Sequence, residues 1–110
     1  MKRYLIKYVT GLKNELFFHP EAEAEFIAAI DYYEEKQSGL GYDCAREVYT
    51  GIKSIIEHPQ TWLVLDGDIR RRLIGRFPYG ILYSDEGHTI FILAVMHLHR
   101  EPNYWKKRII

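Results

Sequence analysis

The sequence predicts an α+β domain in which a helical hairpin packs on a small, mostly antiparallel sheet. The expected order is strand, helix, helix, strand, strand, strand. Two segments with a helical apolar period fill the first half of the chain, and short β-rich segments separated by turn residues fill the second half. Because 110 residues is the size of one ordinary domain, we expect a single domain over residues 1–110.

The first strand and the first helix follow one another directly. The segment ELFF, residues 15–18, is a candidate strand just before Pro20, which suits the first turn of a helix. Acidic residues follow Pro20 near the positive end of the helix dipole, and Gly39 is placed to cap the end of the helix. The apolar stripe of this helix consists of Ala22, Phe26, Ala29, Ile30 and Tyr33.

A second helix is expected from about Tyr42 to His58, where Pro59 stops it. The connection SGLG is short, so the two helices should be antiparallel neighbours. The apolar stripe of the second helix consists of Ala45, Val48, Tyr49, Ile52, Ile55 and Ile56.

Three strands are expected in the second half of the chain, at IRRRLI, YGILYS and TIFILAVMH, with DEGH as the turn between the last two. The last of them, 89–97, is apolar on both faces: Phe91, Leu93 and Val95 point one way, and Ile90, Ile92, Ala94 and Met96 the other. Two helices cover only one face of a sheet. We therefore expect the second face to be partly open, with the N-terminal segment YLIKYV covering part of it and Tyr104 and Trp105 fixing the C-terminal tail.

Composition excludes several classes of protein. A content of 47% hydrophobic and 27% charged residues argues against disorder, and one cysteine, Cys44, excludes an intramolecular disulfide. No apolar run is long enough to cross a membrane and no signal-peptide pattern is visible, so we expect a cytoplasmic protein. His97 and His99 lack a third ligand at a suitable spacing, so neither a metal nor another cofactor is expected.

Charge is balanced overall and polarised along the chain. The 15 basic and 15 acidic residues give a net charge of zero, but residues 19–58 hold nine acidic and three basic residues. The segment RRRLIGRFPYGILY, residues 70–83, carries four arginines on two expected strands. We interpret these arginines as a positive sheet surface that lies opposite an acidic helical hairpin and attracts an acidic partner.

Four segments together carry a family resemblance: FHPEAEAEF, GLG, RRRLIGRFPYGILY and AVMHLHREPNYWKKR. In this order they resemble the RelE/ParE superfamily of bacterial toxins, from about residue 16 to residue 108, and the last two segments are closer to the ParE side. Residues 1–14 lie outside the family pattern as a possible extension.

The resemblance implies the toxin of a type II toxin–antitoxin system. A ParE-like toxin binds a protein target such as DNA gyrase and is neutralised by a cognate antitoxin. On this interpretation the flexible segment of the antitoxin covers a surface formed by Arg70, Arg72, Arg76, Tyr83 and Met96.

Two alternatives stay open. A RelE-like toxin cleaves messenger RNA on the ribosome, and here its catalytic set would consist of Arg72, Arg76, His97, Arg100 and Tyr104. The zero net charge counts against a protein that docks on RNA. The second alternative is a binding module that has the toxin fold without toxicity, because fold alone does not settle function.

Overall fold

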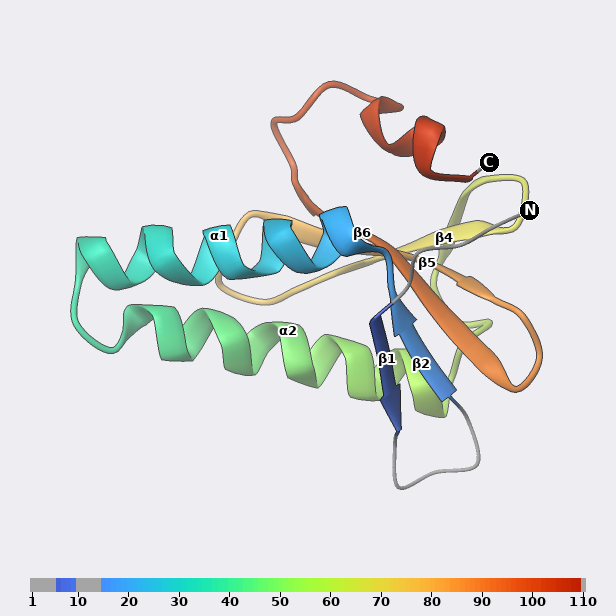
Figure 1. The fold of residues 1–110 in the computed structure, drawn as a ribbon, viewed down its shortest axis with the longest axis horizontal. Coiled ribbons are helices and arrows are strands. Elements are labelled where there is room, and N and C mark those ends of the chain that lie inside the picture. The colour runs from blue at the N-terminus through green and yellow to red at the C-terminus, as the bar shows by residue number, and fades with distance from the viewer. Residues whose placement is uncertain (1–5, 10–14, 110) are drawn as a thin grey trace.

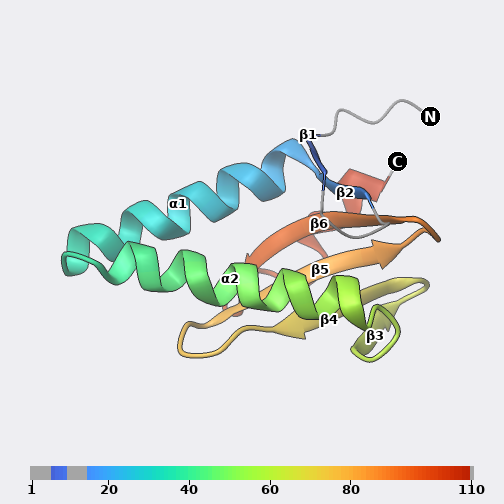
Figure 2. The same cartoon turned by 90° about the horizontal axis from the view of Figure 1, so that it is seen from below.

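The computed structural model describes residues 6–9 and 15–109 of the chain. Helices α1 and α2 lie on one face of a sheet, and a short 3₁₀ helix, η1, lies on the other (Figures 1 and 2). This arrangement confirms the predicted α+β fold with a helical hairpin. The elements, in chain order, are β1 (Ile6–Val9), β2 (Glu15–Phe18), α1 (Pro20–Lys36), α2 (Leu40–Glu57), β3 (Leu63–Asp66), β4 (Ile69–Leu73), β5 (Tyr79–Asp85), β6 (Thr89–His97) and η1 (Tyr104–Ile109).

The sheet has the strand order β1-β2-β6-β5-β4-β3. The β2–β6 pair is parallel and the other pairs are antiparallel, so the sheet is mostly antiparallel as expected. Strand β3 was not predicted, although the Asp66-Gly67 turn that joins it to β4 is a strong hairpin signal. The expectation for YLIKYV was wrong over Ile6–Val9, which pairs edge to edge with β2 instead of covering a face; Tyr4 and Leu5 lie outside the described residues.

Local signals explain where α1 begins. His19 precedes the helix, and its Nδ1 accepts a hydrogen bond from the backbone N–H of Glu21 at 3.1 Å. This bond satisfies one of the N–H groups that the first turn of a helix leaves without a partner. Pro20 occupies the first turn, as expected.

The turn between the helices is closed by a side chain that the sequence did not single out. The Glu34 carboxylate accepts hydrogen bonds from the backbone N–H groups of Gly39 and Gly41, at distances of 3.0–3.1 Å. Gly39, with φ +89°, is the residue before α2, whereas Gln37, two positions earlier, caps α1, so the predicted role of Gly39 as the cap of the first helix was wrong. At Gly41 a Cβ would lie 2.6 Å from the carbonyl oxygen of Ile30, so this glycine allows the two helices to approach closely.

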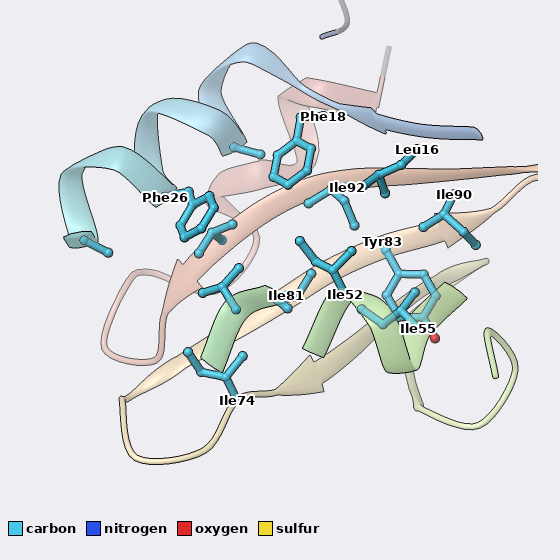
Figure 3. Packing of buried hydrophobic residues seen from close by; sticks show 14 of the residues in the cluster. Leu16, Phe18, Phe26, Ile52, Ile55, Ile74, Ile81, Tyr83, Ile90 and Ile92 are labelled. Atoms are coloured by element: carbon cyan, nitrogen blue, oxygen red, sulfur yellow. The ribbon is translucent and has the colours of Figure 1, made fainter. Parts of the chain in front are cut away.

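The main core lies between the helices and the sheet (Figure 3). The predicted stripe of α2 is confirmed at Val48, Ile52, Ile55 and Ile56, which are buried. It was wrong at Tyr49, whose side chain is 62% exposed and packs edge-on against Phe26. The largest fully buried side chains of this core include Tyr83, Ile81, Ile90 and Ile92 from β5 and β6.

A β-bulge changes the pattern of strand β6. Leu82 pairs with Ala94 and Tyr83 pairs with Ile92, so Leu93 is an extra residue. Beyond the bulge the strict alternation fails: Leu93 and Ala94 both belong to the cluster on the far face, and Val95 joins the core under the helices. The sequence pattern carried no sign of this change, because a bulge is set by the partner strands.

The far face of the sheet is partly open, as expected, but not at β6, where the expectation placed the opening. Phe91 and Met96 are only 5% and 8% exposed and pack in one cluster with Trp105 of η1. The C-terminal tail supplies this cover, as expected for Trp105. Exposed apolar area on the far face lies instead on β3 and β4, where Leu63 and Leu73 are 60% and 49% exposed.

Candidate functional site: the arginines of β4 and the C-terminal end of β6

Strand alternation divides the three consecutive arginines of β4 between the two faces of the sheet. Arg70 lies on the helix side, where its Nη1 donates hydrogen bonds to the carbonyl oxygens of Gln60 and Trp62, at 3.1 and 2.7 Å. These two carbonyls belong to the loop between α2 and β3. Arg70 therefore fixes that loop to the sheet.

Arg72 lies on the same side and links β4 to α2. Its Nε donates to the Ser54 hydroxyl at 2.6 Å, and its Nη1 donates to the carbonyl of Leu73. The guanidinium also stacks 4.6 Å from the centre of the Trp62 ring. Since these contacts all lie within the chain, the role of Arg72 in the structure is to hold elements together.

Arg71 points to the far face. Its stem lies across Gly80 of β5, where a Cβ would be 3.1 Å from both Cγ and Cδ of Arg71. This close approach explains a glycine in the interior of a strand. The Arg71 Nε is buried and has no hydrogen-bond partner in the described part of the chain.

Arg76 lies in the connection between β4 and β5, with φ +69°. Its side chain is 57% exposed, and Nη2 forms an ion pair with Asp43 of α2 at 3.4 Å. An exposed pair of this length contributes little to stability, so Arg76 is available to a partner.

Three other candidate residues gather where β6 ends. The Arg100 guanidinium lies 4.0 Å from the centre of the Tyr104 ring, and the His97 ring packs against Tyr79 and His99, at 5.0 and 5.1 Å between ring centres. His97 and Arg100 line a groove of about 260 Å³ between α1 and β6.

Tyr104 is held in its neutral form. Its hydroxyl donates to Glu25 Oε2 at 2.6 Å, and burial together with that carboxylate raises the pKa of Tyr104 far above its usual value. The phenol therefore stays protonated near neutral pH. Within the described residues, His97, Arg100 and Tyr104 make no contact with Arg72 or Arg76. Those two arginines contact α2 instead.

Comparison with known proteins identifies the family. A family model described as the ParE toxin of the type II toxin–antitoxin system parDE matches residues 16–102. The chain belongs to the ParE toxin family. Among solved structures, a chain of the chromosomal ParDE system from P. aeruginosa has the same fold, with a TM-score of 0.69 and 15% identity over 79% of this chain and 98% of that one. A comparison with curated proteins finds no match.

This ParE toxin is the toxin of a type II toxin–antitoxin system, as the resemblance implied. Two of the five side chains expected at its partner surface are, however, in the protein interior. Tyr83 is fully buried under α2, with its hydroxyl donating to the carbonyl of Pro59 at 2.6 Å, and Met96 is buried beside Trp105. Neither side chain is exposed to a partner in this structure, because α2 and the C-terminal tail cover them.

Three further features of the ParE toxin bear on its chemistry: its single thiol, its possible metal ligands and its helices. Burial raises the pKa of the Cys44 thiol to about 11, so this thiol is not a nucleophile at neutral pH. The described residues contain no group of three or more side chains suited to hold a metal ion. Within the same residues no helix has the length and apolar character needed to cross a membrane.

Sequence reasoning missed three side chains of this region. Glu25 and Arg108 form a partly buried ion pair that fixes η1 to α1, and Arg71 is the arginine of β4 without a hydrogen bond among the described residues. Strand alternation gave a signal for Arg71, since it separates the middle arginine from the other two. Nothing in the local pattern indicated the pairing of Glu25 with a residue near the C-terminus.

Proposed function

We propose that this toxin acts in the cytoplasm by binding a protein target such as DNA gyrase, and that a cognate antitoxin neutralises it. The observation that carries the proposal is the match to the ParE family over residues 16–102. Two structural features support it as well: the contacts of the candidate ribonuclease residues, and the exposed side chains of the helical hairpin.

The candidate ribonuclease set is a poor match to RNA cleavage. Such a reaction needs a base, an acid and cations around one phosphate. Arg72 uses its Nε–H and an Nη1–H within the chain. The Tyr104 hydroxyl already donates to Glu25, and its raised pKa makes it a poor proton donor to a leaving group. The zero net charge also provides little of the phosphate attraction that drives RNA binding.

The helical hairpin offers exposed area to a protein partner. Four large side chains of α1 and α2 are half or more exposed: Ile27, Tyr32, Tyr42 and Tyr49. Tyrosine is enriched at protein interfaces because it combines apolar area with a polar tip. Together with Arg76, which is exposed and paired with Asp43 of α2, these side chains suit binding to a protein.

The test is regulated expression in a bacterium, with DNA supercoiling and translation measured separately. We expect loss of supercoiling while translation is initially intact, and rescue of growth by co-expression of the adjacent small gene. The His97→Gln variant removes the candidate catalytic base and should inhibit growth to the same extent. Rapid messenger cleavage with normal supercoiling would establish the ribonuclease alternative, and unaffected growth would establish the non-toxic module.

A further inference from the structure

Strand β2 leaves the sheet before β6 ends, so the last part of β6 has a free edge. The parallel ladder between the two strands stops at Phe18 and Ile92, and the chain then turns into α1. On its other side, β6 stays paired with β5 as far as His97. The end of β6 therefore has a neighbouring strand on one side and only helix α1 on the other.

This free edge presents a backbone acceptor and a backbone donor. The Val95 N–H donates to Glu25 of α1 at 3.0 Å, so Val95 directs its N–H and C=O away from β5. His97 lies two residues further on and directs its backbone groups to the same side. Tyr79, opposite His97 on β5, agrees with this, since its N–H and C=O both bond to residues of the β4–β5 connection. The Val95 C=O and the His97 N–H thus have no partner among the described residues.

A groove of about 260 Å³ lies between this edge and α1. Its helix wall consists of Ala28 and Ala29, whose small side chains leave the hollow open, and the rings of Tyr32 and Tyr79 line it as well. Glu25 also lines the groove, toward the end where β2 leaves the sheet. The groove is smaller than a usual cofactor site and suits one residue with an apolar side chain of medium size.

The charges at the groove favour a carboxylate. Arg100 lines it and has no carboxylate partner among the described residues; its guanidinium stacks on an aromatic ring instead. The negative charge of Glu25 is compensated by Arg108 at 2.8 Å. The Nδ1 of His97 accepts the His99 N–H at 3.0 Å, so the neutral imidazole carries its proton on Nε2 and adds a second donor beside the groove.

The free backbone groups match a residue that continues the place of β2 in the sheet. In a parallel ladder, one residue donates its N–H to a partner C=O and accepts through its own C=O from the partner N–H two residues further on. Val95 and His97 offer this pair, in the orientation that β2 already has beside β6. Arg100 follows just beyond the strand, where the carboxylate of such a residue would lie. A guanidinium is suited to two parallel hydrogen bonds with a carboxylate.

We propose that this groove binds the C-terminal residue of a partner protein. The amide N–H of that residue donates to the Val95 C=O, and its carboxylate accepts from the His97 N–H and from Arg100. Its apolar side chain, such as that of leucine, lies against Ala28 and Ala29. Addition to a strand edge and capture of a terminal carboxylate are both established ways of recognising peptides. The proposal does not depend on which protein the toxin inhibits.

The test uses the isolated chain and nuclear magnetic resonance. The probes are acetyl-Gly-Leu with a free carboxylate, the neutral acetyl-Gly-Leu-amide, acetyl-Gly-Glu-Gly-amide with an internal carboxylate, and inorganic phosphate. We expect acetyl-Gly-Leu to shift the backbone N–H signal of His97 and the Nε–H signal of Arg100, with a dissociation constant about tenfold lower than that of its amide. Equal binding of the amide, or no shift at about 10 mM, would overturn the proposal. Binding of the internal glutamate or of phosphate as tight as that of acetyl-Gly-Leu would also overturn it, in favour of a general anion site.

A pair of matched variants locates the binding. Ala24 and Ala28 are both exposed and lie about one turn apart on α1, and of the two only Ala28 lines the groove. Ala28→Leu fills the groove and should weaken binding of acetyl-Gly-Leu about tenfold, whereas Ala24→Leu should bind as the unmodified chain does. Undiminished binding by a folded Ala28→Leu variant would count against the proposal. Should that variant fail to fold, Arg100→Met serves instead: it should abolish the preference for the free carboxylate over the amide, and an unchanged preference would be equally decisive against it.

Discussion

Glu25 of α1 and Arg108 of η1 form a two-pronged ion pair beside the bulge of β6. Nη1 of Arg108 lies 2.9 Å from Oε1 of Glu25, and Nη2 lies 2.8 Å from Oε2. The same carboxylate accepts from the backbone N–H of Val95, and Nη1 also donates to the carbonyl of Leu93. Strand β2 pairs with β6 only as far as Ile92, so the two side chains supply partners to backbone groups that the ladder leaves unpaired.

We predict that Arg108→Met lowers the free energy of unfolding by about 3 kcal/mol, since it leaves a mostly buried carboxylate and a backbone carbonyl without their partner. The exposed fractions of the two side chains, 7% for Arg108 and 15% for Glu25, support a value in this range. Urea unfolding followed by tryptophan fluorescence measures it. Lys107→Met, on the same short helix and exposed, should change stability by less than about 0.5 kcal/mol. Equal effects of the two variants would show that the ion pair does not stabilise the fold.

Gly41→Ala should destabilise the helical hairpin by about 1–3 kcal/mol, because its Cβ would meet the backbone carbonyl of Ile30, which cannot rotate away. Thermal unfolding of the variant measures the effect. The control is Thr50→Ala, at an exposed site of the same helix, where alanine should be neutral or slightly stabilising. A Gly41→Ala variant as stable as the control would contradict the close approach of the two helices.

Two arginines of the same segment should behave differently on replacement by alanine. Arg72→Ala should cost about 2 kcal/mol of stability, since it removes the bond to Ser54 and the stacking on Trp62. Arg76→Ala removes an exposed ion pair and should cost less than about 0.5 kcal/mol. Chemical denaturation measures the free energy of unfolding of both variants. If the two variants lose similar amounts of stability, the contacts of Arg72 contribute little.

Stability should fall at high pH through Tyr83. Burial raises the pKa of its phenol to about 12, so the folded chain holds this proton more tightly than the unfolded chain, where the pKa is about 10. The contribution is fully present below about pH 10 and is lost as the pH rises to about 12. Burial raises the pKa of Tyr104 and Tyr79 as well, so Tyr83→Phe should reduce the alkaline slope without abolishing it. Unfolding measured between about pH 8 and pH 12 tests this, and an unchanged slope in Tyr83→Phe would contradict it.

The sequence by itself determined the elements whose causes are local. The apolar period predicted both helices, and Pro20 and Pro59 marked where the first begins and the second ends. Alternation and turn residues predicted the β5–β6 hairpin, with β6 recovered over its full length. The order of these elements, together with four quoted segments, was enough to indicate the family.

Tertiary structure alone decided which surfaces are open and which side chains are free. The bulge at Leu93, the parallel pairing of β2 with β6 and the burial of Met96 under Trp105 depend on contacts between distant parts of the chain. The same holds for the arginines, which look equivalent in the sequence. Arg70 and Arg72 are used within the fold because α2 and its loop lie over them, whereas Arg71 faces a side of the sheet where no acceptor among residues 6–9 and 15–109 bonds to its buried Nε–H. Strand periodicity places a residue on a face, but only the packing of remote elements determines what that face meets.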